Sequence, residues 1–180
     1  LSEEKDINNI VALWKESFGD TEADIYFFLK AHYNPDNTLV YEDEGNIASV
    51  LFLLEGEMHI KGVDYPSYYL YAACTSAKYR GKGFMAKLLD FAKSCSADRN
   101  KFFIALKPAE ESLYDYYSKF GYKSVFSKKI ATFTRLDSNN DLICKNENPA
   151  PCLSEMRNRF YSDIDYFKWD DNSVNFAFEH

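Results

Sequence analysis

The sequence feature that most constrains this chain is the run over residues 69–85, which reads YLYAACTSAKYRGKGFM. Its aromatic and apolar start predicts a strand, Gly81 and Gly83 predict a turn, and the apolar spacing after Gly83 predicts a helix. The first backbone N–H groups of a helix have no partner within it, and the peptide dipoles add partial positive charge there. A glycine turn that enters a helix is therefore suited to an anion such as phosphate. Arg80 and Lys82 add cations beside it, although a solvated surface loop is the alternative interpretation of this turn taken alone.

A second segment, residues 114–122, reads YDYYSKFGY and places Tyr117 four residues before a glycine-aromatic pair. With the glycine turn upstream and a predicted strand between them, this segment resembles the GNAT superfamily of acyl-CoA-dependent N-acetyltransferases. The superfamily's signature, Arg/Gln-x-x-Gly-x-Gly/Ala, falls on Arg80, Gly83 and Met85, of which Met85 is bulkier than the usual small residue. The run RGKGFMAKLL is most similar to bacterial acetyltransferases of the enhanced-intracellular-survival type, in which further domains follow the GNAT domain.

The resemblance implies the GNAT fold, an α+β architecture with a mixed, mostly antiparallel sheet flanked by helices on both faces. The hydrophobic spacing agrees with this architecture. It predicts helices over residues 2–18, from 21, over 84–98 and over 108–120, and strands over 39–41, 47–54, 58–60, 68–75, 102–106, 122–126 and 129–136. Residues 47–54 are apolar on both faces, which is typical of a central strand that is buried on both sides.

The chain divides into three parts by composition. Residues 1–136 are assigned to the GNAT domain, and residues 137–153, which are polar and rich in Asn with two prolines, to a linker. Residues 154–180 are expected to be a helical segment, in which Ser154 caps a helix with one apolar face formed by Met156, Phe160, Ile164 and Phe167. That face must dock on the domain, on a second subunit or on further chain, and the resemblance favours the start of a further domain.

By the same resemblance, acetyl-CoA is the cosubstrate. Its pyrophosphate is expected at the turn, beside Arg80 and on the backbone amides of Gly81, Lys82, Gly83, Phe84, Met85 and Ala86. Its pantetheine arm is expected to pair with the backbone of Ala73, Cys74 and Thr75, where an N–H group stabilises charge on the thioester carbonyl. Cys74 as an acyl-carrying nucleophile is the alternative, but no histidine lies near it in the sequence.

The resemblance assigns Tyr117 as the general acid that protonates the departing thiolate, and a tyrosine that only fills the core is the alternative. The candidate bases are Glu55 and Glu57, which are expected at the end of the central strand, where exposed strand-end acids are the alternative interpretation. His59 is a further candidate base.

The composition limits the partners. Lys and Arg number 21 against 28 Asp and Glu, a formal charge of −7, which argues against nucleic acid and is compatible with an amine substrate. No apolar run approaches the ~20 residues that span a membrane, and the four cysteines show no metal-ligand spacing. Fourteen tyrosines are compatible with subunit contacts in a homo-oligomer.

The sequence thus predicts a cytoplasmic N-acetyltransferase that uses no metal. It is expected to transfer an acetyl group from acetyl-CoA directly to a small-molecule or peptide amine. A non-catalytic module that binds acyl-CoA and a structural scaffold are the alternatives.

Overall fold

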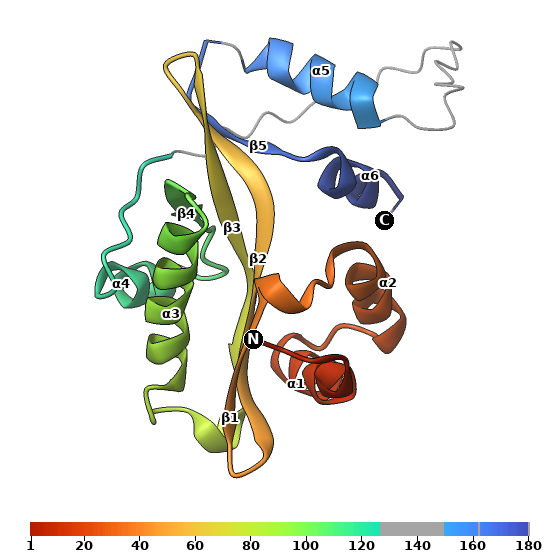
Figure 1. Cartoon of the computed structure of the whole chain (residues 1–180), viewed down its shortest axis with the longest axis vertical. Coiled ribbons are helices and arrows are strands. Elements are labelled where there is room, and N and C mark those ends of the chain that lie inside the picture. The colour runs from red at the N-terminus through yellow and green to blue at the C-terminus, as the bar shows by residue number, and fades with distance from the viewer. Residues whose placement is uncertain (127–149, 162, 180) are drawn as a thin grey trace.

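The computed structural model describes residues 1–126, 150–161 and 163–179, and in them one sheet with helices on both faces (Figure 1). The strands are β1 (Thr38–Asp43), β2 (Asn46–Ile60), β3 (Val63–Thr75), β4 (Phe103–Ala105) and β5 (Tyr166–Trp169). They follow the order β1-β2-β3-β4, with β3 and β4 parallel and the other pairs antiparallel. Strand β5 pairs with β2 on the edge that β1 occupies further along, so strands far apart in the sequence share one edge of β2.

The helices are α1 (Ile7–Phe18), α2 (Glu22–His32), α3 (Phe84–Asp98), α4 (Ser112–Ser118), α5 (Ala150–Phe160) and α6 (Asp171–Glu179). Figure 1 shows α1 and α2 on one face of the sheet and α3 and α4 on the other, with α6 beside α2. Short 3-10 turns precede α1, β1 and the glycine turn. The predicted α+β architecture, a mixed and mostly antiparallel sheet between two helical layers, is confirmed.

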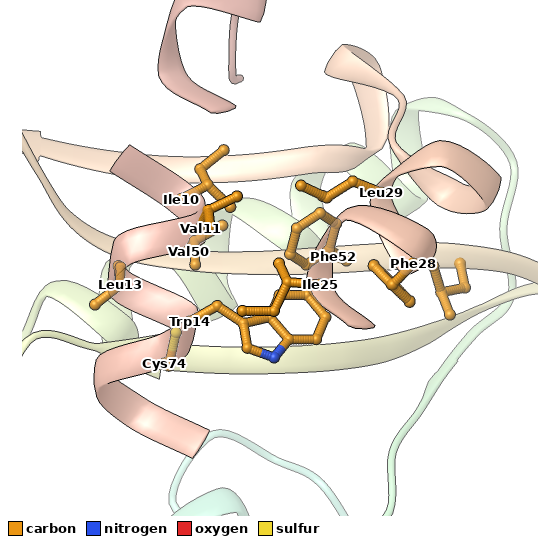
Figure 2. Packing of buried hydrophobic residues seen from close by; sticks show 11 residues of the cluster. Ile10, Val11, Leu13, Trp14, Ile25, Phe28, Leu29, Val50, Phe52 and Cys74 are labelled. Carbon is orange, nitrogen blue, oxygen red and sulfur yellow. The ribbon is translucent and has the colours of Figure 1, made fainter. Parts of the chain in front are cut away.

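Strand β2 forms the centre of the core because its side chains alternate between the two faces. Val50 and Phe52 pack with Trp14 of α1 and Phe28 of α2, in the cluster that Figure 2 shows. Leu51 and Leu53 belong to the second cluster, against α3. A strand that is buried on both faces reads as a continuous apolar run, as predicted for residues 47–54.

The predicted break in this strand is wrong. β2 runs without interruption to Ile60, because β3 pairs with it along one edge and β5 pairs with the other edge from Gly56 onward. Glu55 and Glu57 therefore lie inside the strand and not at its end.

Three other predicted elements differ from the structure. Residues 122–126 form no strand, and the strand predicted over 129–136 lies outside the described residues. Helix α4 begins at Ser112, later than Pro108. The helix predicted from Ser154 is α5, which begins earlier, at Ala150, and ends at Phe160. Phe167 lies in β5 and not on the face of that helix. The C-terminal segment docks on the domain itself, since β5 extends the sheet and α6 contacts α2.

Ion pairs add to this docking. Lys168 of β5 binds Asp64 at 2.7 Å and Glu57 at 3.0 Å. Hydrogen bonds from Lys168, and then from His59, lower the pKa of the Asp64 carboxyl.

In the described residues, no helix is long and apolar enough to cross a membrane.

Gly56 lets β5 approach β2. A Cβ atom on Gly56 would lie 2.8 Å from the backbone oxygen of Lys168 and closer still to the ring of Phe167.

We expect Gly56→Ala to lower the free energy of unfolding by about 1–3 kcal/mol and to reduce the amide protection of β5 in hydrogen exchange. Glu42→Ala, an exposed position of β1 remote from β5, is the control. Unchanged protection of β5 in Gly56→Ala would contradict this packing.

Candidate active site

Strand β3 separates from β4 part-way along its length. The two strands pair only from Ser67 to Tyr69, whereas β3 continues to Thr75. In the described residues no strand therefore pairs with the β4 side of β3 beyond Tyr69. The backbone groups of this edge are available to an extended ligand, in the way that an edge strand accepts another strand.

A β-bulge lies at the same place. Between the pairs Val50↔Cys74 and Phe52↔Tyr71, β3 has two residues opposite one residue of β2. One of the two, Ala72, has a φ of 47°, in the left-handed region that alanine rarely adopts. Bulges change the direction of a strand and are common beside active sites. Strain of this kind persists only where the surrounding packing holds it.

The glycine turn lies between the end of β3 and α3. Gly81 and Gly83 have φ values of 79° and 78°, and a Cβ added at either would meet no atom within 4 Å. Gly83 is the N-cap of α3. No acceptor among the described residues takes the N–H groups of these two glycines. An open turn with such amides suits an anion, and the anion site itself stays a prediction.

Neighbouring side chains fix the turn. The Nε of Arg80 donates to the backbone oxygen of Thr75 at 3.2 Å, which ties the turn to the end of β3. Phe84 is buried and stacks on Tyr41 with ring centroids 4.3 Å apart. Met85 packs against the α3-side core, so its bulk lies away from the turn. Lys82 is largely exposed, with its Nζ 3.9 Å from Asp43, and Ala86 is partly buried in the first turn of α3.

Ala73, the second residue of the bulge, and the two residues that follow it have different surroundings. Ala73 borders the cluster under α3, and the hydroxyl of Thr75 lies 2.8 Å from that of Ser49. Cys74 is buried in the cluster under α1, where desolvation raises its pKa to about 12. A thiol with this pKa stays protonated at neutral pH, which disfavours Cys74 as a nucleophile.

Tyr117 lies on α4 and borders the same cluster as Ala73 and Met85. Burial, and then the neighbouring Tyr116, raises the pKa of its phenol above the ordinary value of 10.0. Its ring contacts those of Tyr116 and Tyr122, with centroids 5.4 and 5.7 Å away. No hydrogen bond to the Tyr117 hydroxyl is formed within the described residues. The side chain is therefore a protonated donor at neutral pH.

The candidate bases lie elsewhere. Glu55 is ion-paired with Lys101 and accepts a hydrogen bond from Asn37, and Glu57 is ion-paired with Lys168. Both glutamates line a cavity of about 440 Å³ between β2 and the C-terminal segment. The structure brings neither of them into contact with Tyr117 in the part of the chain that it describes. His59 is bound to Asp64 at the far end of β2.

A second cavity, of about 470 Å³, lies on the α2 side of the sheet and was not predicted from sequence. Its aromatic walls are formed by Phe28, Tyr71, Trp169 and Phe176, and its polar groups include His32 and Arg157. We call it the aromatic cavity. Tyr71 directly precedes Ala72, so one wall residue of the cavity is the neighbour of the bulge in β3. The walls come from segments far apart in the chain, and no local pattern indicates that they meet.

His32 is the histidine of this cavity. Its ring packs on Phe28 and Phe176, each with centroids 4.9 Å away, and its Nδ1 lies 3.4 Å from the amide nitrogen of Asn172. Burial lowers the pKa of His32 below 6.5, although the charge of Asp170 opposes the shift. The imidazole is therefore neutral at pH 7 and able to accept a proton.

Comparison with known proteins identifies the family. The model of the acetyltransferase (GNAT) domain matches residues 1–125. The chain belongs to the GNAT acetyltransferase family. Membership of this family supports acyltransferase activity, and the family uses acetyl-CoA as its cosubstrate. No curated protein matches the sequence. In the described residues, no group of three or more His, Cys, Asp or Glu side chains is placed to hold a metal ion.

Solved structures agree with this GNAT fold. A probable N-acyltransferase from Enterococcus faecalis is 15% identical with a TM-score of 0.60, and the match covers 69% of this chain and 32% of that one. Eis1 from Mycobacterium abscessus is 12% identical with a TM-score of 0.55, over 65% of this chain and 30% of that one. A transcriptional regulator from Bacillus halodurans is 14% identical with a TM-score of 0.62, over 73% of this chain and 96% of that one. This chain thus spans less than a third of the length of the first two proteins and nearly all of the length of the third.

Proposed function

We propose that this domain transfers an acetyl group from acetyl-CoA directly to the nitrogen of an amine. The observation that carries the proposal is the separation of β3 from β4 beside the glycine turn that enters α3. The bond from Arg80 to Thr75 joins a turn that suits an anion to the edge of β3. Since no described strand pairs with this edge, the two features together suit a ligand with a diphosphate and an extended amide-bearing arm. Acetyl-CoA has this chemistry.

In the proposal, the diphosphate lies on the amides of residues 81–86, and the pantetheine arm follows Ala73, Cys74 and Thr75. When it is bound, acetyl-CoA supplies an activated acyl group as a thioester. The residues of the chain orient it, and an N–H beside the bulge stabilises charge on the carbonyl oxygen. The acceptor approaches from the aromatic cavity, because Tyr71 forms part of both its wall and the strand that carries the bulge.

Two proton transfers complete the reaction. As the N–C bond forms and the C–S bond breaks, Tyr117 protonates the thiolate, for which its raised pKa keeps the proton available. Glu55 and Glu57 remain predictions for the base, but both are ion-paired and line the other cavity. The proposal therefore assigns the amine proton to His32, a neutral imidazole in the aromatic cavity.

Several finer assignments stay predictions. The similarity to the enhanced-intracellular-survival type, the cytoplasmic location, the homo-oligomer and the domain boundary at residue 136 are supported by sequence alone. The sheet pairing of β5 favours a domain that includes the C-terminal segment.

Binding of acetyl-CoA is tested by thermal unfolding. A ligand at about a hundredfold its Kd adds about 2.7 kcal/mol, which raises Tm by several degrees in a domain of this size. We expect Gly83→Glu to abolish the shift, because it places a carboxylate in the anion site. Gly62→Glu is the matched control, since Gly62 has a φ of 81°, equally open surroundings and a place in the distant β2–β3 turn. No shift in the unsubstituted protein would exclude both the enzyme and the CoA-binding module, whereas a shift without amine-dependent CoA release would favour the module.

The acid is tested with Tyr117→Phe. We expect kcat to fall about a hundredfold, within the range for loss of a general acid, while the acetyl-CoA-induced Tm shift is retained. Tyr116→Phe, at a neighbouring ring of the same cluster, should keep kcat within a few fold. In the unsubstituted protein, the alkaline fall in kcat should lie above pH 10, because the pKa of Tyr117 is raised. Equal kcat values for the two variants would contradict the assignment.

The base is tested with His32→Gln. We expect kcat at saturating acceptor to fall about a hundredfold. Because the pKa of His32 is lowered, the unsubstituted protein should keep its neutral base down to a pH below 6.5, and the variant should lose this acidic limb. His59→Gln is the control. A variant with reduced kcat but an unchanged pH profile would show that His32 only supports the cavity wall.

A further inference from the structure

Arg157 is the one arginine that lines the aromatic cavity in the described structure. Its side chain is half-buried, and its Nη2 donates to the backbone oxygen of Phe167 at 2.8 Å. The guanidinium carbon lies 5.8 and 5.6 Å from the ring centroids of Tyr161 and Tyr166, within the range of cation-π contact. The backbone of β5 and two tyrosine rings thus hold the group in place at the cavity.

No carboxylate neutralises this charge within the described residues. Arg157 forms no ion pair there, and no Asp or Glu is among the described side chains that line the aromatic cavity. Desolvation lowers the pKa of Arg157, which reflects the unfavourable environment of its charge. His32, in the same cavity, is neutral at pH 7. Since partly buried charges are normally paired, and Arg157 has N–H donors beyond the one that Phe167 uses, an anionic ligand group suits this position.

The neighbouring cavity has the opposite character. Its lining includes Glu55, Glu57, Asp170 and Asp171, against Lys101 and Lys168. Among the described side chains, the carboxylates that would attract a polycationic amine therefore lie outside the aromatic cavity. The aromatic walls favour an apolar body, and a volume of about 470 Å³ suits a small molecule.

Building on the proposed function, we propose that the acceptor is a hydrophobic amine that also carries a carboxylate, as an aromatic or large aliphatic amino acid does. Arg157 binds the carboxylate, the aromatic walls pack on the side chain, and the amino group faces the bulge at Ala72. Transfer forms the N–C bond of the N-acetyl amino acid and releases CoA as the thiol. The amine proton passes to the base, and the proton of Tyr117 passes to the sulfur. Arg157 is a specificity residue in this scheme.

The proposal is tested with phenylalanine, phenylalaninamide and spermidine as acceptors. Phenylalaninamide has nearly the same shape as phenylalanine but no negative charge, and spermidine is a polycation without an apolar ring. Because a hydrogen bond to a charged group contributes about 1.5–3 kcal/mol, kcat/KM for phenylalanine should exceed that for the amide about 10- to 100-fold. Spermidine should be the poorest acceptor.

Arg157→Met separates recognition from structure. It should lower kcat/KM for phenylalanine to that of the amide, chiefly through KM, and leave the amide's value unchanged. Arg157→Lys should keep part of the preference, because it retains the charge without the planar pair of donors. Arg159→Met is the control, an exposed position of the same helix that does not line the cavity. If Arg157 had a merely structural role, its replacement would lower kcat/KM equally for phenylalanine and for phenylalaninamide.

The outcomes distinguish this inference from the proposed function. Failure of acetyl-CoA to shift Tm, or of every amine to release CoA, counts against the proposed function. Equal use of phenylalanine and its amide, or preference for spermidine, overturns the acceptor inference alone. If acetyl-CoA binds but no acceptor in the panel is acetylated, calorimetry with phenylalanine decides: binding that Arg157→Met abolishes supports the inference, and absence of binding overturns it.

Discussion

The β-bulge at Ala72 is the constraint on which the arrangement of the site depends. Two residues of β3 opposite one residue of β2 change the direction of β3, and beyond Tyr69 the strand no longer pairs with β4. The chain then turns through two left-handed glycines into α3, and Arg80 ties this turn to the end of the strand. In the part of the chain that the structure describes, an unpaired strand edge and an unpaired helix start thus lie next to each other. Neither feature alone identifies a ligand, but together they favour one that is extended and anionic at one end.

Strand β2 makes this strain tolerable, because it is packed on both faces. The cluster with Trp14 and Phe28 fixes one side and the cluster under α3 fixes the other, so the bulged strand has a rigid neighbour along its length. Strand β5 extends the same sheet, and Gly56 allows its close approach. The C-terminal segment thereby becomes part of the wall of the aromatic cavity, and its position depends on a residue about a hundred positions earlier in the chain.

Local patterns predicted the parts of this fold that local physics determines. The glycine turn, helix α3, the doubly buried stretch of β2 and the helix that carries Tyr117 each follow from spacing over a few residues. The bulge did not, since Ala72 and Ala73 read only as small residues. The pairing of β5 with β2 depends on a contact between Gly56 and Phe167 that no short window contains. The break predicted before Met58 was wrong for the same reason, because β5 supports the strand there. His32 and Arg157 lie in separate helices, and only the tertiary fold places them in one cavity.

The net charge of −7 gave little guidance about the acceptor, because charge acts where it lies and not as a sum. Glu55 and Glu57 are neutralised by lysines in one cavity. The aromatic cavity instead combines a neutral histidine with an arginine that no described carboxylate neutralises. In the proposed reaction, residues 73–86 and Tyr117 act on the acetyl donor, whereas α2, β5 and the helices around β5 surround the acceptor. Tyr71 connects the donor residues with the segments around the acceptor, since it precedes the bulge and lines the aromatic cavity. The choice of amine can therefore change through the C-terminal segment while the donor site stays the same.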